Sequence, residues 1–200
     1  MIRAMLGARE IDALQELATI GCGQAVSALS RLSGRQLQMD VPETWLGDEP
    51  GAIADFLGTM GQDLVAVGVR LSELLEGYLV LALPEADAER LAGALGWPVP
   101  PGGRWGQLAE SAMMESGNVV GSAFVSAVAR LVGRKLLLSV PTLARGGGQA
   151  CLDALVPREA GRVALATRFA CRAPALEGLI LVMPEPARIP GLLAALPLGA

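Results

Sequence analysis

Apolar residues recur at helical spacing in two long segments of the chain. One runs from about residue 8 to 33 and the other from about 105 to 132, and each ends at a Gly-Arg pair. Each is followed by three short apolar or alternating stretches typical of β-strands, the first of which ends in Val-Pro. A Pro-Glu pair then begins a second helical segment, where proline in the first turn costs no hydrogen bond. The pattern predicts helix, three strands and helix, twice over.

These elements fall at corresponding places in the two halves. The later strands of each half are predicted near 62–71 and 77–83, and near 161–170 and 178–183. The second helices are predicted at 84–95 and 184–196. We expect the segment 142–150, which ends in Gly-Gly-Gly-Gln-Ala, to be a surface loop.

The two halves are copies of one unit. The segment at 34–42, GRQLQMDVP, aligns with GRKLLLSVP at 133–141 at an offset of 99 residues. The stretches VSALSRL and VSAVARL align just upstream at the same offset. Self-similarity of this kind indicates a duplicated supersecondary unit.

A Pro/Gly-rich joint at 96–103 separates the copies, and it could link two domains or form a hinge within one. We favour the hinge, because a three-stranded sheet with two helices is marginal alone. We therefore expect residues 1–200 to form a single domain of two repeats, about 1–100 and 101–200. The predicted fold is α+β and two-layered. Pseudo-twofold helix-β-β-β-helix units share a mostly antiparallel sheet, with the two long helices on the surface.

Composition narrows the function. With 52% hydrophobic residues the chain can fill a core, and a net charge of −4 argues against binding nucleic acid. Histidine is absent, which removes the commonest general base and zinc ligand. No apolar run reaches the roughly 18 residues of a membrane span, and the N-terminus lacks the core of a signal peptide. We expect a cytoplasmic protein without membrane insertion, whose three widely spaced cysteines are reduced core thiols.

Polar side chains share one face of the second long helix. At about 100° per residue, Ser111, Glu115 and Asn118 fall within about 60° of one another, opposite an apolar face. We expect this stripe to face outward, where Glu115 could pair with a cation and the Asn118 amide could orient a water molecule. A solvated helix face would show the same spacing, so the spacing alone does not establish a site.

The first long helix carries a partial copy of the stripe at Asp12, Glu16 and Thr19. The glutamate is kept, but threonine stands where the second helix has asparagine. Small residues lie beside both stripes, and each glycine costs about 1 kcal/mol of helix propensity relative to alanine. We expect them to permit a close approach of a neighbouring surface. They are Gly21 and Gly23 in the first helix, and Gly117 and Gly121 in the second.

The motif D/S-x-x-x-E-x-x-N on each long helix, followed by the small-residue stretches IGCGQA and VVGSA, resembles the CheC-type chemotaxis phosphatases. Within the group of CheC, CheX and FliY, the duplicated layout and the length are most similar to CheC. The resemblance covers nearly the whole chain. It implies hydrolysis of the aspartyl phosphate on the response regulator CheY.

The resemblance also implies roles for individual residues. Asn118 would position the attacking water, Glu115 would pair with the active-site lysine of the receiver, and Ser111 occupies the first motif position. Thr19 departs from the pattern, so Asp12, Glu16 and Thr19 are expected to form a weak or inactive second site. The chain would need no cofactor of its own, because phosphorylated CheY would carry Mg²⁺.

Two other functions remain open at this point. Proteins similar to CheC also partner the receptor deamidase CheD, so the chain could be a non-catalytic binding module that regulates CheD. A structural role in the flagellar switch is a third hypothesis. It is disfavoured because FliY carries a C-terminal switch domain without a counterpart in this sequence.

Overall fold

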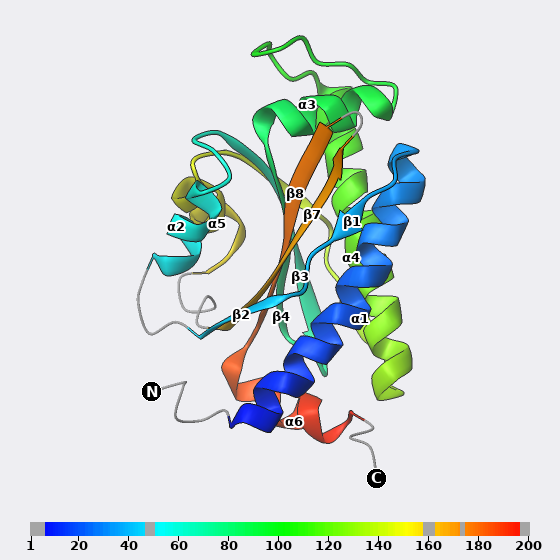
Figure 1. Ribbon diagram of the computed structural model, residues 1–200, viewed down its shortest axis with the longest axis vertical. Helices are drawn as coiled ribbons and strands as arrows, with labels where there is room; N and C mark the ends of the chain where they lie inside the picture. The colour runs from blue at the N-terminus through cyan, green and yellow to red at the C-terminus, as the bar shows by residue number, and fades with distance from the viewer. Residues whose placement is uncertain (1–6, 47–50, 158–162, 173–174, 197–200) are drawn as a thin grey trace.

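The computed structural model describes residues 7–46, 51–157, 163–172 and 175–196 (Figure 1). The first half contains α1 (Ala8–Ser33), β1 (Gln38–Met39), β2 (Glu43–Leu46), α2 (Ala52–Gly58), β3 (Leu64–Glu73), β4 (Gly77–Pro84) and α3 (Glu85–Ala94). The second half contains α4 (Gln107–Val132), β5 (Leu136–Leu138), β6 (Thr142–Gly146), α5 (Gly148–Leu155), β7 (Val163–Arg172), β8 (Ala175–Pro184), the 3₁₀ turn η2 (Pro186–Arg188) and α6 (Ile189–Ala194). The elements follow the same order in both halves, as the internal repeat predicts.

The described strands form one eight-stranded antiparallel sheet in the order β1-β7-β8-β4-β3-β5, with β2 also beside β7 and β6 also beside β3. The halves meet at the centre, where β4 pairs with β8. The outer strands are exchanged: β1 and β2 pair with β7 of the second half, and β5 and β6 pair with β3 of the first. The predicted α+β class, with a shared antiparallel sheet and pseudo-twofold duplication, is confirmed.

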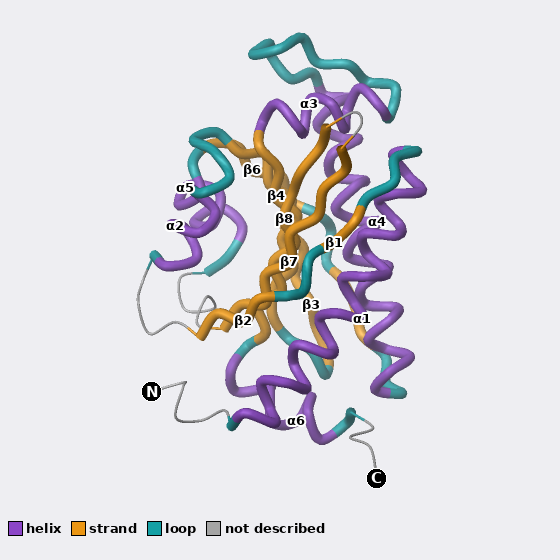
Figure 2. The backbone as a smooth tube through the Cα atoms, in the orientation of Figure 1, coloured by secondary structure: helices purple, strands orange, loops and turns teal. Residues whose placement is uncertain are grey.

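Helices cover both faces of this sheet (Figure 2). The long helices α1 and α4 pack side by side on one face, with the larger hydrophobic core between them and the sheet. The short helices α2 and α5 lie together on the opposite face, over a second core. The sequence pattern predicted the first layer of helices but not this second cover.

A glycine ends each long helix in the same way. Gly34 follows α1 with φ 66°, and Gly133 follows α4 with φ 63°. In this left-handed conformation the Gly34 N–H reaches the carbonyl of Ser30, and the Gly133 N–H reaches that of Ala129. Glycine adopts the conformation without a Cβ clash, which explains why the Gly-Arg pair is present in both copies.

The glycines within the long helices do allow close packing, although not all of them. A Cβ on Gly21 would overlap the ring of Phe124, so α1 approaches α4 closely at this point. A Cβ on Gly117 would overlap Val67 of β3, and one on Gly121 would lie 3.1 Å from Val69. Gly23 is different: the nearest atom to its Cβ would be a methionine sulfur at an ordinary 3.8 Å.

Two predictions about local structure were wrong. The segment 142–150, expected to be a loop, contains β6 and the start of α5. Strand β6 pairs with β3 over five residues, and this distant partner leaves no local signal in the sequence. The helix expected at 184–196 begins only at Ile189, because Pro190 lacks an N–H and must lie in the first turn of a helix. Positions 161 and 162 of a predicted strand lie outside the described residues.

The cysteines were predicted to be reduced core thiols. Cys22 and Cys151 are free thiols and are buried, whereas Cys171 is only half-buried. Burial disfavours the charged thiolate and raises the pKa of the Cys22 thiol to about 11, and it also raises the pKa of the Cys151 thiol. These two thiols are therefore protonated near neutral pH and act as apolar packing groups.

Candidate functional site

The polar stripe of α4 lies on the outer side of the helix. The side chains of Ser111 and Glu115 are exposed and that of Asn118 is half-buried, while Met113 and Phe124 on the opposite face have no exposed surface. The helix is therefore anchored by its apolar face and presents the carboxylate and the amide toward solvent.

Two of the three stripe residues touch each other. The Asn118 Nδ2 donates to Glu115 Oε2 at 3.5 Å, the long limit of a hydrogen bond. Because the amide nitrogen faces Glu115, the Asn118 Oδ1 remains an open acceptor, and Glu115 keeps lone pairs for another donor. In the described part of the chain, Ser111, one turn earlier, forms no hydrogen bond with either of these residues.

The corresponding residues of α1 are arranged differently. Asp12, Glu16 and Thr19 are all exposed on one side of the helix. The Thr19 hydroxyl donates at 2.8 Å to the carbonyl of Gln15, four residues earlier in the same helix. Its one proton is thus used within the helix, and Thr19 has no second donor to offer a ligand or to reach Glu16.

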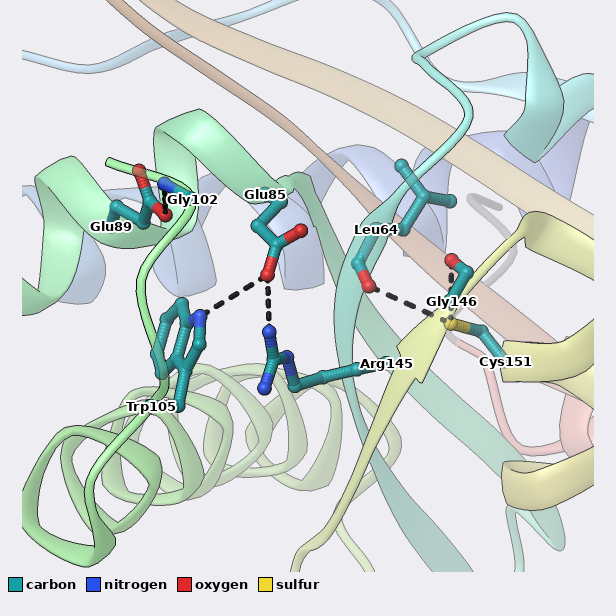
Figure 3. A network of polar contacts seen from close by, with 8 residues as sticks. All are labelled: Leu64, Glu85, Glu89, Gly102, Trp105, Arg145, Gly146 and Cys151. Atoms are coloured by element: carbon teal, nitrogen blue, oxygen red, sulfur yellow. Dashed lines mark hydrogen bonds and ion pairs between the residues drawn. The ribbon is translucent and has the colours of Figure 1, made fainter. Parts of the chain in front are cut away.

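A polar cluster holds the start of α4 in place (Figure 3). Trp105, two residues before the helix, donates from Nε1 to Glu85 Oε1 at 3.2 Å, and Arg145 of β6 pairs with the same oxygen. The Arg145 guanidinium also lies 5.2 Å from the centre of the Trp105 ring. A carboxylate in the first turn of a helix, as at Glu85 of α3, is typically a capping charge. In the structure this carboxylate also joins α3 to the segment before α4 and to β6.

The loop before α4 has a second attachment. The backbone N–H of Gly102 donates to Glu89 Oε1 at 3.0 Å, as Figure 3 also shows. Glu89 belongs to α3, so this bond ties the Pro/Gly-rich joint to the same helix as Glu85. Together these contacts define where α4 begins and therefore where its polar stripe lies.

A hollow of about 360 Å³ adjoins the stripe, and we call it the Trp97 groove. Its apolar lining comes from Leu32, Leu95, Trp97, Leu108 and Ala112, and Ser111 and Glu115 line it as well. The sequence pattern does not reveal this groove, because its residues come from three separate places: α1, α4, and the segment that follows α3. The one available signal was a tryptophan in a Pro/Gly-rich joint.

The described residues show neither a cluster of metal-binding side chains nor a membrane-spanning helix. Among them, no group of three or more His, Cys, Asp or Glu side chains is placed to hold a metal ion. Among the same residues, no helix combines the length and the hydropathy needed to cross a bilayer.

Comparison with known proteins identifies relatives by sequence. The family model described as CheC-like family matches residues 10–45. The CheC1 protein of Halobacterium salinarum is 30% identical over 146 residues, which cover 72% of this chain and 73% of that protein. The CheY-P phosphatase CheC of Bacillus subtilis is 29% identical over 138 residues, covering 66% of this chain and 64% of that protein.

Solved structures show the same fold at lower identity. FliY of Thermotoga maritima matches with a TM-score of 0.68 and 18% identity, covering 94% of this chain and 98% of that one. CheX in its complex with CheY, BeF₃ and Mg²⁺ from Borrelia burgdorferi matches with a TM-score of 0.55 and 16% identity, covering 82% and 95%. The sequence relatives over most of the chain and the shared duplicated fold lead to one conclusion: this protein belongs to the CheC-like family.

Proposed function

We propose that this chain hydrolyses the aspartyl phosphate of a phosphorylated CheY-type response regulator. The observation that carries the proposal is the pair of the exposed Glu115 and the half-buried Asn118 on the outer side of α4, close enough to act on one ligand. The CheY-P phosphatase CheC of Bacillus subtilis, a sequence relative, supports the choice of substrate.

The proposed chemistry is positioning rather than covalent catalysis. An acyl phosphate is already activated, so hydrolysis needs a water molecule held in line with the bond from phosphorus to the aspartate oxygen. In this proposal the water donates a hydrogen bond to Asn118 Oδ1, which turns an oxygen lone pair toward phosphorus. As the new P–O bond forms, the bond from phosphorus to the aspartate oxygen breaks and the receiver aspartate leaves as its carboxylate. The proton released from the water leaves on the phosphate product or to solvent.

Glu115 has a separate role in the proposal. Its carboxylate pairs with the active-site lysine of the receiver and so fixes the register of α4 on that surface. The 3.5 Å contact with Asn118 is weak enough to leave the carboxylate available for the lysine. The receiver would carry the Mg²⁺, which would neutralise charge on the transferred phosphoryl group. Ser111 lies at the edge of the surface where Glu115 meets the receiver.

The residues of α1 form a second site with little or no activity in this proposal. Thr19 is shorter than asparagine, lacks an amide, and donates its hydroxyl to Gln15. Its oxygen can still accept a hydrogen bond from a water, but it lies closer to the helix than an amide oxygen would and has no amide to set the water's orientation. Asp12 and Glu16 keep the surface of this site polar and exposed.

Replacing Asn118 with alanine tests the proposal. The rate of phosphate loss from a phosphorylated CheY-type receiver should rise when wild-type protein is added, and Asn118→Ala should lower this acceleration about 100-fold. Ser126→Ala, at an exposed position further along α4, is the matched control and should retain full activity. Equal rates of phosphate loss with and without wild-type protein would contradict the proposal and favour the non-catalytic binding module.

A further inference from the structure

The Trp97 groove exposes large apolar side chains directly beside the proposed catalytic residues. Leu108 is 57% exposed and Trp97 is 44% exposed. Single exposed apolar side chains are common at protein surfaces, whereas an apolar patch is informative. Leu108 and Trp97 are not scattered, since both line one hollow together with Leu32 and Leu95. An apolar hollow with an accessible tryptophan is typical of a docking site for a partner's side chain.

The groove is continuous with the proposed catalytic stripe. Ser111 and Glu115 line it, and Leu108 precedes Glu115 by seven residues, or about 10 Å along the helix. A stable protein interface covers about 800 Å² on each partner. A receiver whose lysine pairs with Glu115 would therefore also cover the groove.

The other copy differs at one position of this lining. At the offset of 99 residues, Leu108 corresponds to Arg9, which is exposed on α1. An arginine cannot bury its charge in an apolar hollow without a paired anion. One apolar residue of the lining, beside the complete motif, is thus replaced by a charged residue beside the incomplete one.

We propose that the Trp97 groove binds an apolar side chain of the phosphorylated receiver, beside its phosphoaspartate, and thereby selects which receiver is dephosphorylated. This inference rests on the function proposed above, because that function supplies the partner. The groove contributes binding and specificity, while Glu115 and Asn118 act at the phosphoryl group. A receiver with a charged side chain at this contact is a poor substrate.

Leu108→Arg gives the direct test, because it introduces the residue found in the other copy. Steady-state hydrolysis of the phosphorylated receiver should show KM raised about ten-fold with kcat nearly unchanged. Trp97→Ala should also raise KM. Because this variant introduces no charge, it shows whether the effect of Leu108→Arg comes from loss of the apolar contact and not from the new charge alone. Leu137→Arg is the matched control: Leu137 is 40% exposed on β5, outside the groove, and its replacement should leave KM unchanged.

Calorimetric titration with the receiver activated by BeF₃⁻ separates the two proposals, because it measures binding without turnover. Weaker binding by Leu108→Arg and Trp97→Ala, with thermal stability unchanged, supports the groove even if the wild type proves catalytically inactive. Unchanged binding and KM in both variants overturn the groove and leave the phosphatase function intact. A wild type that neither binds nor dephosphorylates the receiver overturns both proposals. If Leu108→Arg only converts a wild-type dimer into monomers, a second copy occupies the groove and the proposal is wrong.

Discussion

The long helices α1 and α4 are copies of one sequence that now present different surfaces. Both have 26 residues, end at a left-handed glycine and carry a glutamate at the same place on an exposed face. They differ in the next functional position, where Thr19 donates to its own helix while Asn118 faces Glu115. In the proposed function, this one side chain separates the stripe that has an amide to orient a water from the stripe that has none.

The two helices also differ in how closely they pack. Helix α4 carries Gly117 and Gly121 against Val67 and Val69 of β3, whereas the corresponding residues of α1 are Ala18 and Cys22. Helix α1 instead has Gly21, which receives the Phe124 ring of α4. Helix α4 therefore approaches β3 closely at these two glycines, while α1 packs on both α4 and β7. Close packing on two sides limits movement of α4, which suits the water-positioning role proposed for Asn118.

Among tests of the difference between α1 and α4, the largest effect is expected on stability, from changing the contact between the two helices. Gly21→Ala places a methyl group in the Phe124 ring and should lower the free energy of unfolding by about 1–3 kcal/mol. Gly23→Ala, two residues away in the same helix, meets only a sulfur at 3.8 Å and should be neutral or raise stability by up to about 1 kcal/mol. Urea unfolding followed by circular dichroism measures both. Equal stability of the two variants would contradict this account of the packing.

A smaller effect is expected from the two glutamates. Glu115→Gln removes the charge that pairs with the receiver lysine and should lower kcat/KM for the phosphorylated receiver about ten-fold. Glu16→Gln makes the same change on α1 and should alter kcat/KM little. If both variants lose activity equally, the two helices contribute equally and the asymmetry proposed here is wrong.

The smallest effect is expected from restoring the motif on α1. Thr19→Asn supplies the missing amide on α1. However, α1 still has Arg9 at the position where α4 has Leu108 of the Trp97 groove, so activity should rise by less than about two-fold. Adding Arg9→Leu to Thr19→Asn should raise activity further. Phosphate release per mole of protein measures both, in the Asn118→Ala background, where only α1 can contribute. No gain from the double variant would show that the first copy lacks more than these two residues.

The periodic parts of the sequence predicted the main elements closely. Both long helices begin and end within about two residues of their predicted limits, and the central strands match to within about three. Their apolar positions repeat at the period of the element itself, so the information is local. The face on which Ser111, Glu115 and Asn118 lie followed from the same periodicity.

Short elements could not be predicted in this way. Helices α2 and α5 have seven and eight residues, too few for a clear period and too few to be stable alone. They form because each covers apolar strand residues and packs on the other. Strand β6 likewise exists through its pairing with β3, a partner from the other half of the chain.

The sequence by itself determined the duplication, the long helices, the polar stripe and the loss of asparagine at Thr19, because each is encoded in neighbouring residues or in a fixed offset. Only the tertiary structure decided the exchange of outer strands between the halves, the cluster around Glu85 and the Trp97 groove. These features join residues that are far apart along the chain. Their contacts depend on how the helices and strands pack, which no local pattern of hydrophobic residues specifies.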